Sequence, residues 1–310
     1  MRRDPFLCSG AMALTLMLAG CGGGGTSVAN IPPPETTPTP TPTPPPTPTP
    51  DPTPPPADYE PVVVFPSVTK TTDFSAVGIE ANHYTEDGSL NTVGFAVRYD
   101  ADSGVYVMSV PTAQNGQFYS NASSEQYWDG ELRNPSFSDG VEVSVLKPGT
   151  GDPQFTYSSL ASYYTFGSWP GNYGWFAFGT PTPASAVPVT GSATYSALVQ
   201  GSPGWAAVLE GTGTFNFDFG AGLLSGHLDF AGSDPAMVGT YDFANTVFGV
   251  GSTSFSGDLT NPGFSQTGSF SGNFTGPHAE ELISTWTAPF HNPLSGQDSM
   301  GFGVLVGKRP

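Results

Sequence analysis

Apolar and polar side chains alternate with a period of two along much of the second half of the chain. In residues 214–219, three phenylalanines take every second position, and Thr, Asn and Asp stand between them. Residues 224–230 repeat the pattern, with His227 on the polar side. Successive side chains of a strand point to opposite faces, so the alternation predicts strands with one buried face. About eight such strands fit between residues 191 and 306, enough to close a small up-and-down barrel. A sandwich is the alternative.

Shorter strand patterns precede this region. Residues 62–65 predict a short apolar strand, and residues 92–99 and 104–110 predict a hairpin. No long segment has helical periodicity, and Gly, Ser, Thr, Phe and Tyr are abundant. Asp100 and Asp102 lie in the hairpin turn without the other ligands of a calcium loop, so they are interpreted as turn residues.

The N-terminal segment has the features of a lipoprotein signal. Arg2 and Arg3 precede an apolar run at residues 6–17, which is too short to span a bilayer and is typical of a secretory signal. Residues 18–21 read Leu-Ala-Gly-Cys, which has the form of a lipobox. This predicts a signal peptide at residues 1–20 and lipid attachment at Cys21, where each buried methylene of the acyl chains contributes about 0.8 kcal/mol.

Residues 21–57 are expected to form a tether. A run of glycines leads into Thr-Pro repeats, which favour polyproline II and bury no apolar surface. At about 3.1 Å per residue, the repeats would hold the folded part roughly 60 to 75 Å from the lipid. That reach suits surface display on the outer membrane, although proline tethers also occur on periplasmic lipoproteins.

The most specific pattern in the chain is the run at residues 268–286, which begins Gly-Ser-Phe-Ser-Gly-Asn-Phe-Thr-Gly-Pro-His-Ala-Glu-Glu. It resembles the C-terminal signature of the transferrin-binding protein B family of bacterial surface lipoproteins, approximately G-x-F-x-G-x-F-x-G-P-x-A-x-E. Residues 188–195 resemble the P-x-x-G-x-A-x-Y segment that opens the family's barrel. Ile283-Ser284 departs from the Gly-Gly pair that the family usually has there. Gly276-Pro277 is expected to end a strand, and residues 279–282 to form one short helical turn.

The alternation and the resemblance together predict an all-β chain. An N-terminal β-rich handle-like domain, residues 58–182, is followed by a C-terminal eight-stranded antiparallel β-barrel, residues 183–310. The resemblance implies capture of an extracellular protein or an iron- or haem-carrying ligand for nutrient uptake, with delivery to an outer-membrane import receptor. Transferrin receptors of this type carry two such lobes, whereas residues 58–310 have room for one. A monomer is expected.

Two aromatic residues are candidate binding residues. Residues 163–178 form the densest aromatic run, and residues 170–172 predict a turn that places Trp169 and Tyr173 near a loop tip. Exposed rings of this kind anchor protein or sugar partners, because they offer a large contact area at low entropic cost. The alternative is that both rings pack under the hairpin as core.

Charge restricts the partners. The formal net charge is −18 and no basic patch occurs, so nucleic acid is not an expected partner, whereas a basic protein or a cation is compatible. The four histidines have no zinc-ligand spacing, and neither an enzyme nor a cofactor is expected. His278, Glu280 and Glu281 cluster at the corner after the signature strand, where a structural role competes with a metal or acid-base role.

Three other functions remain open. The second hypothesis is a structural or adhesive surface module that binds glycan or another envelope component. An envelope hydrolase with a carboxylate pair and a barrel embedded in the outer membrane are weaker alternatives, the latter because the lipobox would make it redundant.

Overall fold

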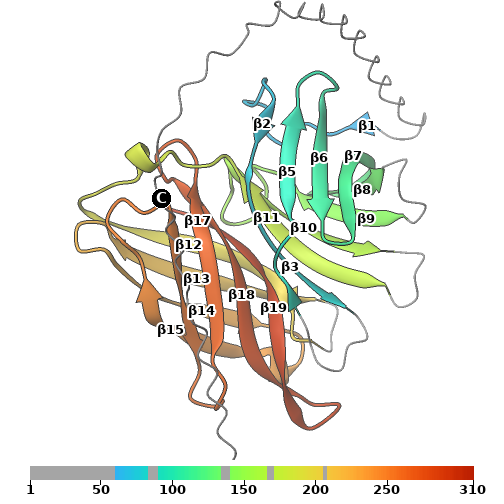
Figure 1. The fold of residues 1–310 in the computed structure, drawn as a ribbon. Coiled ribbons are helices and arrows are strands. Elements are labelled where there is room, and N and C mark those ends of the chain that lie inside the picture. The colour runs from blue at the N-terminus through green and yellow to red at the C-terminus, as the bar shows by residue number, and fades with distance from the viewer. Residues whose placement is uncertain (1–59, 83–89, 134–139, 166–170, 205–207) are drawn as a thin grey trace, which may run out of the picture. The chain divides into compact units, whose positions relative to one another are not determined.

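The structure, a computed structural model, describes residues 60–82, 90–133, 140–165, 171–204 and 208–310. Within these ranges the chain forms a curled antiparallel sheet followed by a closed antiparallel barrel (Figure 1). This confirms the predicted all-β fold class. No helix in these ranges is long and apolar enough to cross a membrane.

The first sheet has eleven strands. They are β1 Glu60–Pro61, β2 Thr72–Asp73, β3 Ser75–Asn82, β4 Leu90–Asn91, β5 Ala96–Asp100, β6 Val105–Val110, β7 Ala113–Ser123, β8 Tyr127–Arg133, β9 Val141–Leu146, β10 Ser158–Thr165 and β11 Asn172–Gly179. β5 to β11 pair in chain order, and β3 then pairs antiparallel with β11. One face of the curled sheet closes around an apolar core that includes Phe65, Tyr106 and Phe178.

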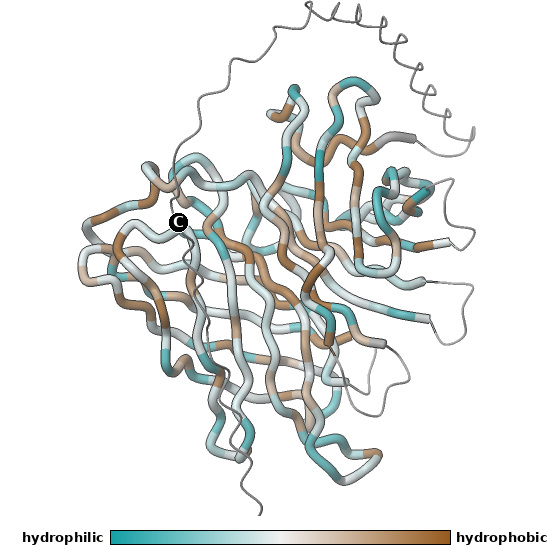
Figure 2. The backbone as a smooth tube through the Cα atoms, viewed as in Figure 1, coloured by the Kyte–Doolittle hydropathy of each residue, from teal (hydrophilic) through white to brown (hydrophobic). Residues whose placement is uncertain are grey.

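The barrel is made of eight strands in chain order. They are β12 Ser192–Ser202, β13 Leu209–Asp218, β14 Leu223–Ala231, β15 Gly239–Val247, β16 Ser254–Thr260, β17 Gly268–Thr275, β18 Glu281–Asn292 and β19 Gln297–Lys308, with 3-10 turns η1 Ala184–Ala186 before β12 and η2 Pro235–Met237 before β15. Pairing of β12 with β19 closes the ring, which leaves no open edge. Hydrophilic stretches lie at the turns, including the β18–β19 hairpin (Figure 2).

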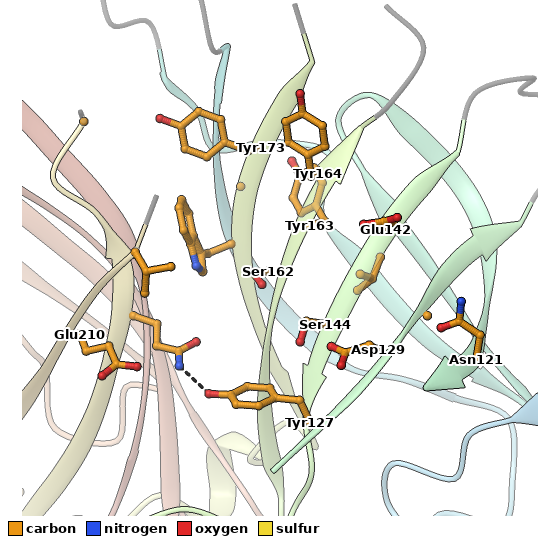
Figure 3. A pocket seen from close by; sticks show the side chains of 17 residues that line it. Asn121, Tyr127, Asp129, Glu142, Ser144, Ser162, Tyr163, Tyr164, Tyr173 and Glu210 are labelled. Carbon is orange, nitrogen blue, oxygen red and sulfur yellow. Dashed lines mark hydrogen bonds between the residues drawn. The ribbon is translucent and has the colours of Figure 1, made fainter. Parts of the chain in front are cut away.

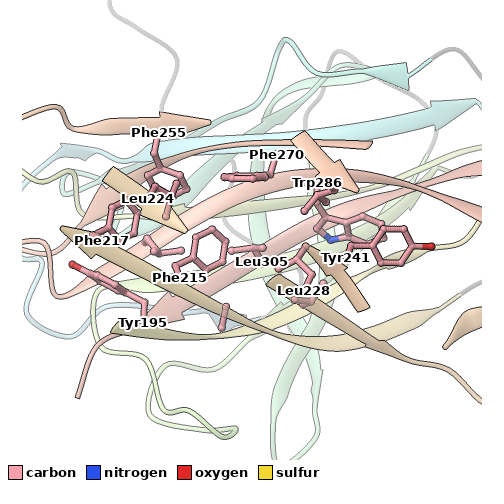
Figure 4. Packing of buried hydrophobic residues seen from close by; sticks show 14 of the residues in the cluster. Tyr195, Phe215, Phe217, Leu224, Leu228, Tyr241, Phe255, Phe270, Trp286 and Leu305 are labelled. Carbon is pink, nitrogen blue, oxygen red and sulfur yellow. The ribbon is translucent and has the colours of Figure 1, made fainter. Parts of the chain in front are cut away.

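Aromatic side chains fill the barrel interior. Phe215, Phe217 and Phe219 all point inward, as their alternation predicts, and the Phe217 ring lies 4.8 Å from that of Phe274. Figure 4 shows Phe215 and Phe217 among buried side chains from other strands of the barrel, including Phe255 and Phe270. The barrel interior is therefore a packed core.

Gly201 makes room for the largest side chain inside the barrel. Trp286 is fully buried, and its Nε1 donates to the carbonyls of Gln200 and Val304, each at 3.3 Å. Gly303 pairs with both Gly201 and Trp286 across the strands, and a Cβ at Gly201 would collide with the indole. The indole therefore occupies space that only glycine leaves at this position.

The signature after β17 forms a tight corner. β17 ends at Thr275, as Gly276-Pro277 predicts, and the Tyr195 hydroxyl donates to the carbonyl of Ala279. Arg309 donates from its backbone to Glu280 and from its guanidinium to the His278 carbonyl. The two segments that carry the family resemblance, residues 188–195 and 268–286, are thus joined by one buried hydrogen bond.

Tyr195→Phe is expected to lower the free energy of unfolding by about 1 kcal/mol, because the Ala279 carbonyl loses its buried donor while the ring packing remains. Chemical denaturation monitored by tryptophan fluorescence measures this. Thr194→Ala, on the outward face of the same strand, is the control and should change stability by less than about 0.5 kcal/mol. Equal stability of Tyr195→Phe and the unchanged protein would contradict the role of the hydroxyl in holding the corner.

The two parts of the fold are joined by polar and apolar contacts. Glu281, at the start of β18, is buried, and its carboxylate accepts from the backbone amides of Thr156 at 2.6 Å and Tyr157 at 3.0 Å. Burial raises the pKa of Glu281, although these hydrogen bonds and Lys308 oppose the shift. Beside this contact, an apolar cluster joins the outer surface of β18 and β19 to the sheet.

Two local predictions are wrong. Residues 62–65 form no strand: Val64 and Phe65 are buried as a cap on the sheet core, and the Phe65 amide donates to the side-chain hydroxyl of Tyr106 and not to a backbone carbonyl of a strand. Residues 279–282 form no helical turn, because Ala279 has a φ of 58° and Glu281 already begins β18. In residues 62–65 the apolar run reports burial and not a strand, and in residues 279–282 the good helix formers are overridden by the corner.

Candidate functional site

One face of the sheet is divided into an apolar part and a polar part. The apolar part packs on the barrel, where the Trp175 ring lies 5.6 Å from that of Phe302. The buried residues of this contact are Ile79, Ala81, Leu146, Phe155, Leu160, Trp175 and Ala177 with Ile283, Phe302, Val304 and Val306. These residues fix the sheet against β18 and β19.

The polar part of this face begins next to Trp175. Side chains that pair across neighbouring strands share a face, and the register places Ser162 beside Trp175, Ser144 beside Ser162, and Asp129 beside Ser144. Two residues further along, a second row runs from Glu142 through Tyr164 to Tyr173. Apart from the buried Trp175, the side chains of these two rows are half-buried or exposed and line open space.

A cleft of about 900 Å³ lies between this polar part and the barrel. We define the cleft by Tyr127, Asp129, Glu142, Tyr164, Tyr173 and Trp175 on the sheet and Gln200 and Glu210 on the barrel. Figure 3 shows Glu210 on one side, Asp129 and Glu142 on the other, and Tyr127 between them. Its volume falls in the usual range for ligand sites.

Hydrogen bonds and ring contacts hold the cleft walls together. Gln200 Nε2 donates to the Tyr127 hydroxyl at 2.6 Å, which links the barrel to the sheet (Figure 3). The Tyr173 ring packs on Trp175 and on Phe302, each at 5.7 Å. Burial raises the pKa of both Tyr127 and Tyr173, so both phenols stay neutral at physiological pH.

The cleft is acidic. Asp129, Glu142 and Glu210 line it, and its lining contains no Lys or Arg. Among the described residues, no Lys or Arg pairs with these three carboxylates, whereas neighbouring Glu131 pairs with Arg133 at 3.0 Å. The site therefore offers negative charge beside aromatic rings.

The predicted binding residues are only partly within the described structure. Tyr173 lies in β11, half-buried, and contacts Phe302 of the barrel while lining the cleft. It combines the packing of a core residue with the accessibility of a binding residue. Trp169 and the lipid-attachment residue Cys21 lie outside the described residues.

The acidic lining was missed from the sequence. Asp129, Glu142 and Glu210 lie on three different strands, and only their register brings them together. The one available signal was the alternation in β9, where Glu142 and Ser144 stand between three valines. In the described part of the chain, no cluster of three or more His, Cys, Asp or Glu side chains is placed to hold a metal.

A curled antiparallel sheet joined to a closed eight-stranded barrel defines a two-part all-β architecture with a cleft on the outside of the barrel. The chain is similar in structure to a double mutant of transferrin-binding protein B from Haemophilus parasuis Hp5, with 18% identity and a TM-score of 0.48 over 76% of this chain and 45% of that chain.

Two further solved structures share this similarity. One is the isotype 1 transferrin-binding protein B from serogroup B Neisseria meningitidis, with 16% identity and a TM-score of 0.43 over 76% of this chain and 43% of that chain. The other is described as a surface lipoprotein, with 14% identity and a TM-score of 0.37 over 76% of this chain and 98% of that chain. The chain thus spans less than half the length of the transferrin-binding protein B chains it matches. No family model and no curated protein sequence matches it.

Proposed function

We propose that this chain is a lipid-anchored surface lipoprotein of the outer membrane that binds an extracellular protein or an iron- or haem-carrying ligand for nutrient uptake. The observation that carries the proposal is the acidic, aromatic cleft on the outside of a barrel whose interior is filled. Clefts lined by aromatic rings with a few polar or charged groups are typical ligand-binding sites.

The N-terminal sequence supports the location. A lipobox at Cys21 would supply the anchor, and the Thr-Pro repeats would lift the cleft away from the membrane. Delivery to an outer-membrane import receptor would then follow capture. Transferrin is the partner named for two of the similar structures, and for this chain it is only one example of an extracellular iron carrier.

Protease treatment of intact cells tests this proposal. Peptides from residues 60–310 are expected to appear in the supernatant before the outer membrane is opened, because the tether would place them outside. Mass spectrometry identifies these peptides. Cys21→Ser is the matched control, since it removes the acylated residue and should prevent surface release. Protection of the unchanged protein until the outer membrane is broken would overturn the surface location and the capture that depends on it.

A second candidate function is an adhesive module for glycan or another envelope component. The observation that favours it is the pairing of tyrosine rings with the Gln200 amide in the cleft, since rings stack on sugar faces and amides bond to hydroxyls. Two results would favour this function over nutrient capture. The protein would bind immobilised glycans, and deleting its gene would not impair growth when iron is scarce.

A further inference from the structure

We propose that the cleft binds an arginine- or lysine-bearing segment of a protein partner, an inference that rests on the proposed function because it names the partner chemistry of the same surface. The occupant is a polypeptide segment with cationic side chains. A neutral glycan and a small anion are the competing occupants.

The carboxylates supply the charge complementarity. Glu142 is exposed on the sheet wall, Glu210 is exposed on the barrel wall, and Asp129 is half-buried on the sheet side of the cleft. Like charges that face one cleft repel one another, and an incoming cation relieves this repulsion. A neutral sugar would bring no compensating positive charge, and an anion would be repelled.

The rings supply a second, geometric match. A guanidinium or ammonium group is attracted to the face of an aromatic ring within about 6 Å, and the planar guanidinium also stacks on it. Tyr173 is held by Trp175 and Phe302, and Tyr127 is held by Gln200, so neither ring has to be ordered when a ligand binds.

The size of the cleft favours a segment over a single ion. A volume of about 900 Å³ accommodates several side chains, and the acidic residues stand on opposite walls. Residues on opposite walls engage successive cationic side chains of one extended segment, which gives more contact than one isolated cation.

A labelled octapeptide of alternating arginine and glycine tests the proposal by fluorescence anisotropy with the purified full-length protein. The matched probe replaces arginine by citrulline, which keeps the shape and removes the charge. The cleft variant is Glu142→Gln with Glu210→Gln. The control variant is Asp102→Asn with Asp242→Asn, which removes two exposed charges outside the cleft. Its net charge therefore equals that of the cleft variant.

The arginine peptide is expected to bind more tightly than the citrulline peptide, and the cleft variant to weaken its binding by about tenfold, with the control variant changed by less than about twofold. Equal weakening by both variants would show attraction to overall charge and overturn the proposal. Equal binding of the two peptides, or no binding of the arginine peptide, would also overturn it.

The peptide-binding experiment and the protease test can give independent outcomes. Release from intact cells with no preference for the arginine peptide would leave surface capture standing and remove the cationic segment. Protection from protease with a clear arginine preference would remove surface capture and leave the cleft chemistry in place for a partner inside the envelope.

Discussion

Replacing Trp286 by alanine is expected to lower the free energy of unfolding by about 3 to 5 kcal/mol. Trp286 is fully buried, and its ring lies 4.6 Å from that of Phe230. A Cβ at Gly201 would meet the indole, and Gly201 pairs with Leu209 of β13 and Gly303 of β19, so the backbone beside the ring is held on both sides. The cavity left by the indole would therefore remain largely open. This places the expected loss of unfolding free energy toward the upper end of that range.

Denaturant unfolding followed by far-ultraviolet circular dichroism measures this loss without relying on the tryptophan signal. Thr285→Ala, on the outward face of the same strand, is the control and should cost less than about 0.5 kcal/mol. Trp286→Phe keeps part of the volume and should cost less than the alanine variant. A loss below about 1 kcal/mol for Trp286→Ala would contradict a tightly packed indole in the barrel core.

Replacing Glu281 by alanine is expected to cost about 3 kcal/mol of unfolding free energy, because the backbone amides of Thr156 and Tyr157 lose their acceptor. The loss should appear as an earlier opening of the contact between sheet and barrel. Hydrogen exchange measures this directly, with faster exchange expected at these two amides. Glu280→Ala, at the neighbouring position, leaves both amides paired and serves as the control. Unchanged exchange at both amides in Glu281→Ala would contradict this role of the carboxylate.

The pH dependence of Glu281 has an unusual sign for a carboxyl group. Its pKa is raised in the folded protein above the ordinary 4.5, so the stability linked to it is present below pH 4.5 and is lost as pH rises through the raised value. Glu281→Gln does not titrate. Denaturation at pH 4 and pH 7 should therefore show the unchanged protein losing stability relative to this variant as pH rises. A relative gain would mean that the hydrogen bonds outweigh burial.

Much of the barrel could be predicted from the sequence, because a strict period of two reports directly which face of a strand is buried. Phe215, Phe217 and Phe219 show this, and all three lie in the core. The corner after Thr275 was also predictable, since proline ends a ladder. The helical turn expected after this corner does not form, because Ala279 takes a left-handed conformation that composition does not reveal.

The cleft could not be predicted, because its residues meet through register and not through spacing in the sequence. Glu142 and Tyr173 are separated by a whole strand, and Glu210 comes from the barrel. Tyr173 was identified by its aromatic surroundings, but its placement in a strand against Phe302 depends on the contact between the two parts. Residues 62–65 show the same limit, since an apolar run satisfies a core without joining a sheet.

The pairing of β3 with β11 has a consequence for how the chain acquires its structure. Ser75 meets Gly179 and Asn82 meets Asn172, so the sheet closes only between segments about a hundred residues apart. Contacts over such separations form slowly, because a long loop must close before the contact stabilises it. Among the described strands, residues 75–79 have no partner until β11 has formed, whereas Glu80 and Ala81 also pair with the nearby β4. The barrel has the same requirement, because β12 meets β19 across a comparable separation. We therefore expect both parts to complete their pairing late in folding, after the pairs between successive strands have formed.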